Sequence, residues 1–392
     1  MNLDSDLSIK LKSRSLSQVK IDLIVCGSIA AVESVRFIRS LRRLGATVRV
    51  IMSAGAQNFV TKTPLEWASA GDVQVDFSGT TSHLGEADAL VVAPASANFL
   101  SQAAAGGSDR AELALFQSYL GQKKPVMVLP CMHASLDASP LYQKAVSTID
   151  SLVHWLAPRG EESKLKFPEP ETLADEISHV IRRNESKVML TTGGTRAAID
   201  DVRYVGNRST GRLGRLIAEE LYRNGVETFV VQGPAEFTPQ VSTLLIKIES
   251  VHEMLSACQK IADEQKISAG VFAAAVSDFE PTQATRGKIR SSEENLSIEM
   301  KSTPKVIAHF AKAKFLKVGF KLEPTDKDFA QIYKSYQKKY GLSAMLLNSL
   351  DGLSSGDDHK AHWFCGSSSK NLENKQQIAE AICEHVTSEA PQ

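Results

Sequence analysis

The chain has 392 residues, about twice the length of a typical domain, so we expect two compact domains. Its 45 basic and 45 acidic residues balance, which argues against a nucleic-acid-binding protein and against an acidic solvating tail. The five cysteines show neither CxxC spacing nor a histidine pair of the zinc type, so we predict reduced thiols in a cytoplasmic protein and no metal site. No apolar run approaches the roughly 20 residues that cross a bilayer, so no membrane partner is expected.

The first half of the chain alternates between strand and helix patterns. Residues before Lys20 lack the apolar core of a signal peptide, and we expect residues 1–19 to form a mobile extension. Apolar residues from Val35 to Leu44 have helical spacing and predict a helix after the first strand. Buried strands that alternate with helices indicate an α/β domain with a parallel, doubly wound sheet. The predicted strands lie at 20–26, 47–53, 89–96 and 125–130.

The strand pattern restarts after a charged stretch at 158–177 that holds three prolines. A helix predicted at 213–225 closes with Asn224–Gly225, and the stretch 352–362 is expected to be an exposed loop. We place the domain boundary near residue 185, which gives one domain at 20–184 and another at 185–392. The strands predicted for the second domain lie at 187–194, 227–234, 267–279 and 315–323.

The segment 191–214 has the features of a phosphate site. Gly193 and Gly194 would let backbone N–H groups approach an anion, and residues 207–211 precede a helix N-terminus, where the helix dipole favours negative charge. Arg203 and two further arginines nearby, Arg196 and Arg208, add cationic forks suited to phosphate or carboxylate. The alternative is a capped helix after an ordinary strand-to-helix turn, and the glycine pair alone does not decide between the two.

The whole segment resembles the pattern of phosphopantothenoylcysteine synthetase, the ligase half of the bifunctional coenzyme A biosynthesis flavoproteins. Two departures are visible: Ala197–Ala198 stand where the family has an acidic residue and a proline, and Thr210 replaces a serine. The resemblance continues through 272–281, 288–291, 302–307 and 318–323 to Asn348. The matching residues of the segment are Thr192, Gly194, Thr195, Asp201, Val202, Arg203, Asn207, Ser209 and Gly211.

This resemblance implies a Rossmann-like ligase domain that joins 4′-phosphopantothenate to cysteine, with CTP and Mg²⁺, through an acyl-cytidylate. Asn207 would bind that intermediate, Lys288 would meet the triphosphate, and Arg203 would join them in catalysis. Which of Lys334, Lys338 and Lys339 also meets the triphosphate stays open, as does a preference for CTP over ATP. The other substrate-binding residues that the family implies are Gly193, Gly194, Phe272, Ala273, Ala274, Asp278, Pro304, Lys305, Val306, Ile307, Phe320, Lys334 and Lys338.

Residues 26–34, 53–59 and 93–106, together with His83, resemble the flavin-dependent cysteine decarboxylases that precede the ligase in bifunctional members. The resemblance implies a flavodoxin-like fold, a homo-oligomer and FMN as cofactor. His83 would be the catalytic base, although a single histidine in such a place also suits a structural role. The residues expected to bind FMN are Gly27, Ser28, Ile29, Ala30, Ser53, Ser96 and Asn98.

Two departures leave the decarboxylase activity open. His133 stands where the family has the asparagine that holds the substrate carboxylate, a group that a histidine could also bind. The family's cysteine-bearing flap is absent, because residues 158–171 contain no cysteine. A regulatory or scaffolding flavoprotein is therefore the alternative function, but it would not require Arg203, Asn207, Asp278 and Lys288 together. An NAD-dependent dehydrogenase is excluded, since neither glycine turn has the GxGxxG pattern followed by an acidic residue.

Overall fold

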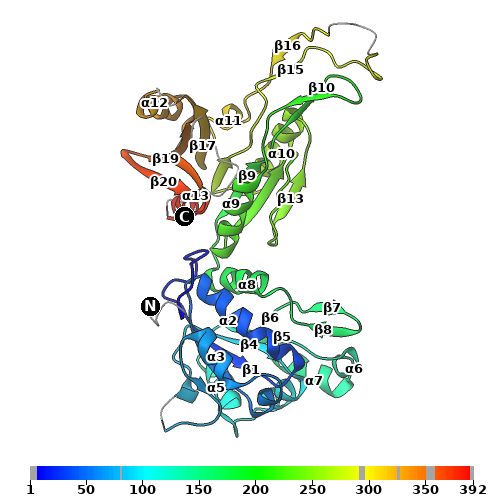
Figure 1. The fold of residues 1–392 in the computed structure, drawn as a ribbon, viewed down its shortest axis with the longest axis vertical. Coiled ribbons are helices and arrows are strands. Elements are labelled where there is room, and N and C mark those ends of the chain that lie inside the picture. Colours follow the sequence, from blue (N-terminus) through cyan, green and yellow to red (C-terminus); the bar gives the residue numbers. More distant parts are fainter. Residues whose placement is uncertain (1–6, 80–81, 291–295, 325–326, 350–357, 389–392) are drawn as a thin grey trace. The chain divides into compact units, whose positions relative to one another are not determined.

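The structure is a computed structural model that describes residues 7–79, 82–290, 296–324, 327–349 and 358–388 (Figure 1). The chain divides into two compact units, Met1–Ile181 and Arg182–Gln392. In the described part of the chain, no helix is long and apolar enough to cross a membrane.

The first unit is built on a six-stranded parallel sheet with the order β3-β2-β1-β4-β5-β6. Without β3 at the edge, the other five strands have the flavodoxin-like order, which confirms the predicted fold class. The strands are β1 (Lys20–Val25), β2 (Thr47–Met52), β3 (Val73–Gln74), β4 (Ala89–Ala95), β5 (Val126–Pro130) and β6 (His154–Trp155).

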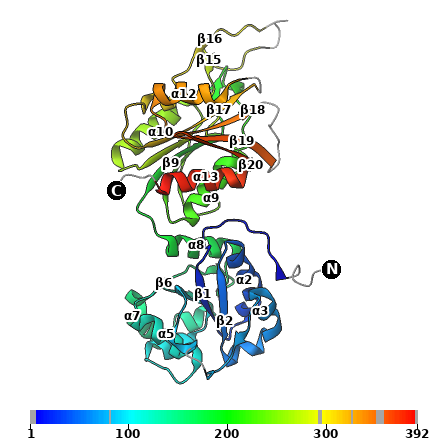
Figure 2. The same ribbon diagram turned by 90° about the vertical axis from the view of Figure 1, so that its left-hand side faces the viewer.

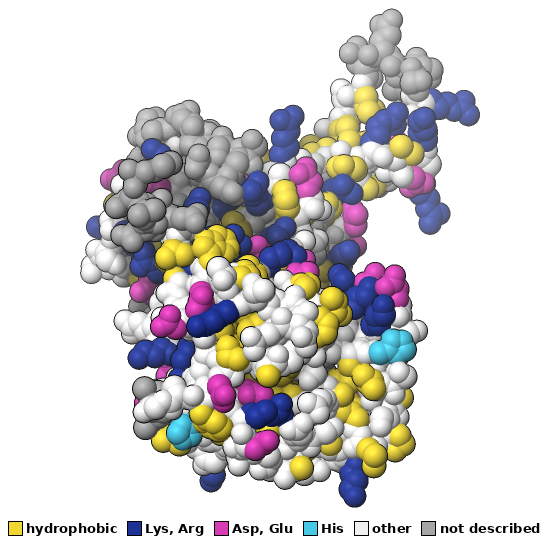
Figure 3. Space-filling view, turned by 60° about the horizontal axis from the view of Figure 1, so that its bottom comes forward, with side chains coloured by type: hydrophobic (Ala, Val, Ile, Leu, Met, Phe, Trp, Pro, Cys, Tyr) yellow, Lys and Arg dark blue, Asp and Glu magenta, His cyan; other side chains and the backbone are white. Residues whose placement is uncertain are grey.

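Helices cover both faces of this sheet, and each face has its own apolar core. On one face lie α2 (Ser34–Arg43), α3 (Lys62–Ser69) and α8 (Pro170–Arg182), and on the other lie α4 (Ala97–Ala104), α5 (Ala111–Gly121) and α7 (Pro140–Ile149). A short helix α6 (Ala134–Asp137) and a hairpin of β7 (Arg159–Glu161) and β8 (Lys164–Lys166) follow β5 and β6. Basic and acidic side chains are interspersed on the face of this unit that Figure 3 turns forward.

The second unit holds an eight-stranded sheet with the order β13-β12-β9-β14-β17-β18-β19-β20. Its first six strands are parallel, and the last two pairings are antiparallel. The chain winds from the central β9 first to one side and then to the other, which confirms a Rossmann-like α/β unit. The strands are β9 (Lys187–Thr192), β12 (Glu227–Gln232), β13 (Leu244–Lys247), β14 (Ala269–Phe272), β17 (Leu316–Glu323), β18 (Ala344–Ser349), β19 (Asp358–Cys365) and β20 (Ser368–Asn374).

The helices of the second unit also form two layers, as Figure 2 shows. One layer consists of α9 (Arg212–Arg223) and α13 (Lys375–Ser388), and the other of α10 (Val251–Glu264), α11 (Val306–His309) and α12 (Phe329–Tyr340). Two small ribbons extend beyond the sheet: β10 (Arg196–Ala198) pairs with β11 (Tyr204–Gly206), and β15 (Phe279–Pro281) pairs with β16 (Met300–Ser302).

The exposed loop predicted at 352–362 is wrong for its last residues, because 358–362 begin β19. His359, Ala361 and Trp363 are buried while Lys360 and His362 between them are exposed, which is the alternation of a strand with one covered face. Polar residue types concealed this alternation in the sequence. Residues 352–357 lie outside the described part of the chain.

The mobile extension predicted for residues 1–19 is wrong for residues 12–19, which pack on the first unit. Leu16 is fully buried, and its N–H donates to the carbonyl oxygen of Leu44 over 2.8 Å. The Ser178 hydroxyl of α8 donates to the Ser15 hydroxyl over 2.8 Å. One buried leucine and a few serines were too weak a pattern to predict this docking.

Leu16→Ala is therefore expected to lower the free energy of unfolding by about 2–5 kcal/mol, because it removes a side chain from a closed core. Leu11→Ala, at a leucine that is 46 % exposed, should change it by no more than about 0.5 kcal/mol. Urea unfolding of both variants measures the difference, and equal effects would contradict the docking of this segment.

Candidate functional site

The second unit places a glycine turn, Gly193–Gly194, directly after β9. Gly193 has a φ of +75°, and a Cβ atom there would lie 2.5 Å from the carbonyl oxygen of Gly233. A Cβ atom on Gly194 would lie 2.9 Å from the carbonyl oxygen of Asn207. The N–H of Gly194 donates to the Pro234 carbonyl over 3.1 Å, so this N–H is used within the protein instead of facing a phosphate. The two glycines thus let backbone segments approach one another closely.

Residues 273–278, which continue β14, lie alongside this turn. The N–H of Ala275 donates to the Gly193 carbonyl over 2.8 Å, and the N–H of Ser277 donates to the Thr195 hydroxyl over 2.9 Å. The exposed Asn207 donates from Nδ2 to the Val276 carbonyl over 3.0 Å. The turn, Asn207 and the segment that includes Ala273 and Ala274 therefore meet at the carboxyl ends of β9 and β14. This is the switch point of the sheet, where ligands bind in open α/β folds.

Asp278 brings a second predicted group to the same edge. Its carbonyl accepts the N–H of Thr303 over 3.0 Å, which ties it to the segment of Pro304 and Lys305. The Lys305 ammonium forms an ion pair with the Asp278 carboxylate, and both side chains are more than half exposed. The pair offers a ligand one charge of each sign.

Asp200, which sequence reasoning missed, organises Arg203. Its buried carboxylate accepts hydrogen bonds from the N–H groups of Val202 over 2.8 Å and Arg203 over 2.6 Å, and it pairs with the Arg203 guanidinium. Burial acts to raise the pKa of Asp200, but these hydrogen bonds and one from the Ile289 N–H together lower it to about 2. An aspartate three residues before an arginine is the local signal that could have revealed this turn.

The same turn holds the loop that carries Lys288. The Ile289 N–H donates to the Asp200 carboxylate over 3.1 Å, and the Gly287 N–H donates to the Asp201 carboxylate over 2.8 Å. Both neighbours of the exposed Lys288 are thus fixed by acidic residues of the 200–203 segment. Hydrogen bonds to Asp200 and Asp201 therefore connect the turn of Arg203 to the loop of Lys288.

The other residues predicted to bind substrate either pack in the cores of this unit or lie exposed on α12. Phe272 and Val306 are buried, and the Phe272 ring packs 5.7 Å from that of Phe310 between centroids. Lys334 and Lys338 are exposed on α12, which packs against β18 and β19, and no contact with Asn207 or Asp278 is seen for them among the described residues. Two further predicted residues, Ile307 and Phe320, are half-buried against the cores of this unit.

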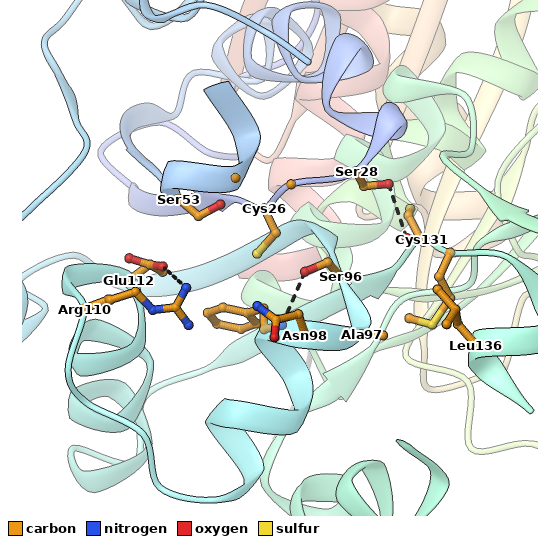
Figure 4. Close-up of a pocket in the computed structure, with 14 residues that line it drawn as sticks. Cys26, Ser28, Ser53, Ser96, Ala97, Asn98, Arg110, Glu112, Cys131 and Leu136 are labelled. Carbon is orange, nitrogen blue, oxygen red and sulfur yellow. Dashed lines mark hydrogen bonds and ion pairs between the residues drawn. The ribbon is translucent and has the colours of Figure 1, made fainter. Parts of the chain in front are cut away.

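A cavity of about 370 Å³ opens in the first unit at the carboxyl ends of β1, β2, β4 and β5 (Figure 4). The backbones of Gly27 and Gly55, which both line the cavity, lie close together, since a Cβ atom on Gly27 would lie 2.8 Å from the Gly55 carbonyl carbon. Ile29 and Ala30 do not line the cavity, and Ile29 is 69 % exposed. The predicted residues that do line it are Gly27, Ser28, Ser53, Ser96 and Asn98.

Serine hydroxyl groups cap the N-termini of two helices beside this cavity, α4 and the short 3-10 helix Ile29–Glu33. Ser96 accepts the Phe99 N–H over 3.3 Å at the start of α4, and Ser28 accepts the Ala30 N–H over 3.3 Å and donates to the Cys131 carbonyl over 3.3 Å. The N-terminus of α4 favours an anionic group, and apolar side chains such as Phe99 form the remaining wall. The volume lies in the range of small-molecule sites, so this set of donors fits the FMN that the family resemblance implies.

The two predicted histidines do not line the cavity. His83 is half-buried in the turn Ser82–Leu84, with its ring 5.9 Å from that of Phe77. His133 is exposed and begins α6, where its Nδ1 accepts the Ser135 N–H over 3.2 Å. A binding role for either side chain stays a prediction.

Among the lining residues that were not predicted to bind FMN, four have titratable side chains: Cys26, Arg110, Glu112 and Cys131. Burial raises the pKa of both thiols, to about 12 for Cys131, so both are protonated at neutral pH. Arg110 and Glu112 come from the start of α5, and the Arg110 Nη1 lies 3.4 Å from the Glu112 Oε1. No sequence signal distinguishes these two from other charges that begin a helix.

The pKa of Asp200 predicts a pH-dependent stability. An unfolded aspartate has a pKa of about 3.9, and the folded value is about 2. Because folding lowers this pKa, the stabilisation is present above about pH 4 and is lost as the pH falls toward 2. Asp200→Asn should therefore lower the free energy of unfolding at pH 7, and the difference from the parent protein should narrow at pH 3.

Urea unfolding at a series of pH values measures this difference. Asp263→Asn, at an exposed position of α10, is the control and should change the free energy of unfolding by no more than about 0.5 kcal/mol. A difference between the parent protein and Asp200→Asn that stays constant from pH 7 to pH 3 would rule out the proposed role of this carboxylate.

Two family models match the chain, one for each unit. Residues 9–182 match the model described as flavoprotein, and residues 183–389 match the model described as DNA/pantothenate metabolism flavoprotein C-terminal domain. A crystal structure of the DNA/pantothenate metabolism flavoprotein from Streptococcus pneumoniae is 25% identical, with a TM-score of 0.47, and the match covers 51% of this chain and 98% of that one.

Curated relatives match over nearly the full length. The coenzyme A biosynthesis bifunctional protein CoaBC of Thermococcus kodakarensis is 31% identical, over 88% of this chain and 89% of that protein. The protein of the same name from Methanocaldococcus jannaschii is 29% identical, over 96% and 95%. Because one family model covers more than half of the chain and a relative above 30% identity aligns over most of it, the chain belongs to the family of coenzyme A biosynthesis bifunctional proteins.

Proposed function

We propose that the second domain is a phosphopantothenate–cysteine ligase that consumes CTP. The observation that carries this proposal is the meeting of Asn207, the backbone of 273–278 and the Asp278–Lys305 pair at the sheet's switch point. The names of the relatives support it. A regulatory flavoprotein would not need this convergence of polar groups in its second domain.

The proposed reaction activates a carboxylate before it meets an amine. A carboxylate oxygen of 4′-phosphopantothenate attacks the α-phosphorus of CTP, and the bond to the leaving pyrophosphate breaks. The amine of cysteine then attacks the acyl carbon, the bond to CMP breaks, and the amine loses a proton as the amide forms. Both steps gather negative charge on phosphate oxygens, which is where fixed donors and cations accelerate a reaction.

The residues of this chain suit those charges. Lys288, held by its two neighbours, would neutralise the triphosphate, and Arg203 supplies a planar fork for phosphate or carboxylate. Asn207 is an exposed amide that would hydrogen-bond the acyl-cytidylate. Asp278 and Lys305 would exchange their mutual ion pair for contacts with substrate.

We expect Mg²⁺ to arrive bound to the nucleotide. Among the described residues, no three histidine, cysteine or acidic side chains are grouped so as to hold a metal. Mg²⁺ is commonly held by one or two carboxylates together with substrate phosphates, so such a group is not required.

For the first domain we propose FMN binding in the cavity at Gly27 and Ser28. When bound, FMN would supply the oxidation and reduction that decarboxylation of 4′-phosphopantothenoylcysteine needs. Two protein groups on which the family's chemistry depends differ here: His133 stands in place of the asparagine, and the β7–β8 hairpin has no cysteine. We therefore propose that this domain keeps the cofactor but lacks the activity.

We also propose a cytoplasmic homo-oligomer. The small ribbons of the second domain expose large apolar side chains, with Val202 at 63 %, Tyr204 at 53 % and Phe279 at 58 % exposure. Exposed apolar groups on projecting ribbons favour association with a second copy. All five cysteines lie in the described part of the chain and none of them forms a disulfide bond, in keeping with a reducing compartment.

The ligase proposal predicts that the purified protein releases pyrophosphate from CTP only when 4′-phosphopantothenate is present. CMP should then appear only after cysteine is added. Asn207→Ala should slow cysteine-dependent CMP release by about 100-fold, because it removes a hydrogen bond to the intermediate. Asn371→Ala, at an exposed asparagine of β20, is the matched control and should keep full activity. Unchanged CMP release in Asn207→Ala would show that this residue has been assigned wrongly.

The decarboxylase proposal predicts that FMN-saturated protein yields no carbon dioxide from 4′-phosphopantothenoylcysteine. The same preparation should be active in the ligase assay, which shows that it is folded. Carbon dioxide is followed with a carboxyl-labelled substrate and the thiol product by mass spectrometry. Formation of 4′-phosphopantetheine would overturn the proposal.

A further inference from the structure

We propose that Arg110 and Glu112 bind the pyrimidine edge of the flavin ring, with Glu112 accepting the N3–H and Arg110 donating to a neighbouring carbonyl oxygen. This inference rests on the proposal that the first domain's cavity takes FMN. Both side chains line that cavity. Figure 4 shows them side by side, below Ser53 and to the left of Asn98.

Glu112 is the buried group that needs a ligand. Its side chain is 2 % exposed, and the Oε1 atom accepts no hydrogen bond from the protein. Burial raises the pKa of this carboxyl even though Arg110 lies 3.4 Å away. A buried carboxylate oxygen without a donor costs free energy, and a ligand N–H that points at it would recover that cost.

Arg110 is held beside it by a short relay from α4. The Gln102 amide donates to the Asn98 Oδ1 over 2.8 Å, and the Arg110 guanidinium donates in turn to the Gln102 Oε1. The relay orients the guanidinium along the cavity wall, and a guanidinium has five N–H donors, more than these contacts occupy. A carbonyl oxygen next to the Glu112 site would therefore find a fixed donor.

An acceptor next to a donor is the complement of an amide edge, in which N–H lies next to C=O. The pyrimidine part of the flavin ring presents such an edge, with N3–H between two carbonyl groups. A phosphate or carboxylate placed here would instead meet the negative charge of Glu112. Arg110 and Glu112 thus select a neutral ring edge, while Ser28, Ser53 and Ser96 line the part of the cavity that is left for the polar remainder of the cofactor.

The test is a titration of the full-length protein with FMN and with 3-methyl-FMN, in which a methyl group replaces the N3 hydrogen. Flavin fluorescence reports binding of each. The parent protein should bind FMN at least about tenfold more tightly than the analogue, which corresponds to about 1.4 kcal/mol. Equal affinities would overturn the inference while leaving the FMN proposal intact, whereas no binding of FMN would overturn both.

Substitutions separate a hydrogen bond from a steric effect of the methyl group. Glu112→Met keeps a similar volume without an acceptor and should bind both flavins within about threefold of each other, whereas Glu112→Gln keeps an acceptor and should keep the preference for FMN. Retention of the preference in Glu112→Met would contradict the assignment. Arg110→Met should weaken both flavins and shift the flavin midpoint potential to a more negative value, because a positive charge near the ring stabilises its reduced form.

The matched control is Glu66→Ala, a glutamate of α3 that does not line the cavity. It should bind both flavins like the parent protein. Thermal unfolding of each variant in the absence of flavin verifies that the domain is folded. The comparison of FMN with 3-methyl-FMN on the parent protein needs no variant.

Discussion

Gly193 and Gly233 allow the turns after β9 and β12 to pass each other in direct backbone contact. A Cβ atom on Gly233 would lie only 1.7 Å from the carbonyl oxygen of Gly194, and one on Gly193 would lie 2.5 Å from the carbonyl oxygen of Gly233. Any side chain here would separate the two turns. Because the Ala275 N–H donates to the Gly193 carbonyl and Asn207 donates to the Val276 carbonyl, the positions of Asn207 and residues 273–278 depend on this contact. Loss of the contact would disperse the ligase site without removing any of its chemical groups.

The elements of both domains could be predicted because strand runs and helix spacing are local properties of the sequence. The fold class and the central strands followed from them, whereas the order Arg203, Asn207, Asp278, Lys288 was recognised from the resemblance to a known family. What could not be predicted depends on long-range contact. Leu16 is one apolar residue among polar neighbours, and only its partners in α2 and α8 explain its burial. The Asp200 turn has a local signal in Arg203, but the sequence gives none for the hydrogen bond that Asp200 accepts from the Ile289 N–H, 89 positions away.

The predicted site residues also form two groups, those whose position the fold fixes and those whose position it does not fix. Residues whose backbone forms the site, such as Gly27, Gly193 and Gly194, lie at strand ends, so the fold places them. Residues with long side chains, such as Lys334 and Lys338, depend on helix position and rotamer, which spacing does not fix. Arg110 and Glu112 were missed for a related reason: a charged pair at a helix start normally faces water, and only the cavity wall shows that Glu112 is enclosed.

Burial also limits the chemistry that the two cysteines of the first domain's cavity can perform. Cys26 and Cys131 both line the cavity, so either thiol could be taken as a substitute for the missing flap cysteine. Burial raises the pKa of each, and a thiol with a pKa of about 12, as at Cys131, gives up its proton poorly at neutral pH. It would therefore be neither an effective nucleophile nor an effective acid.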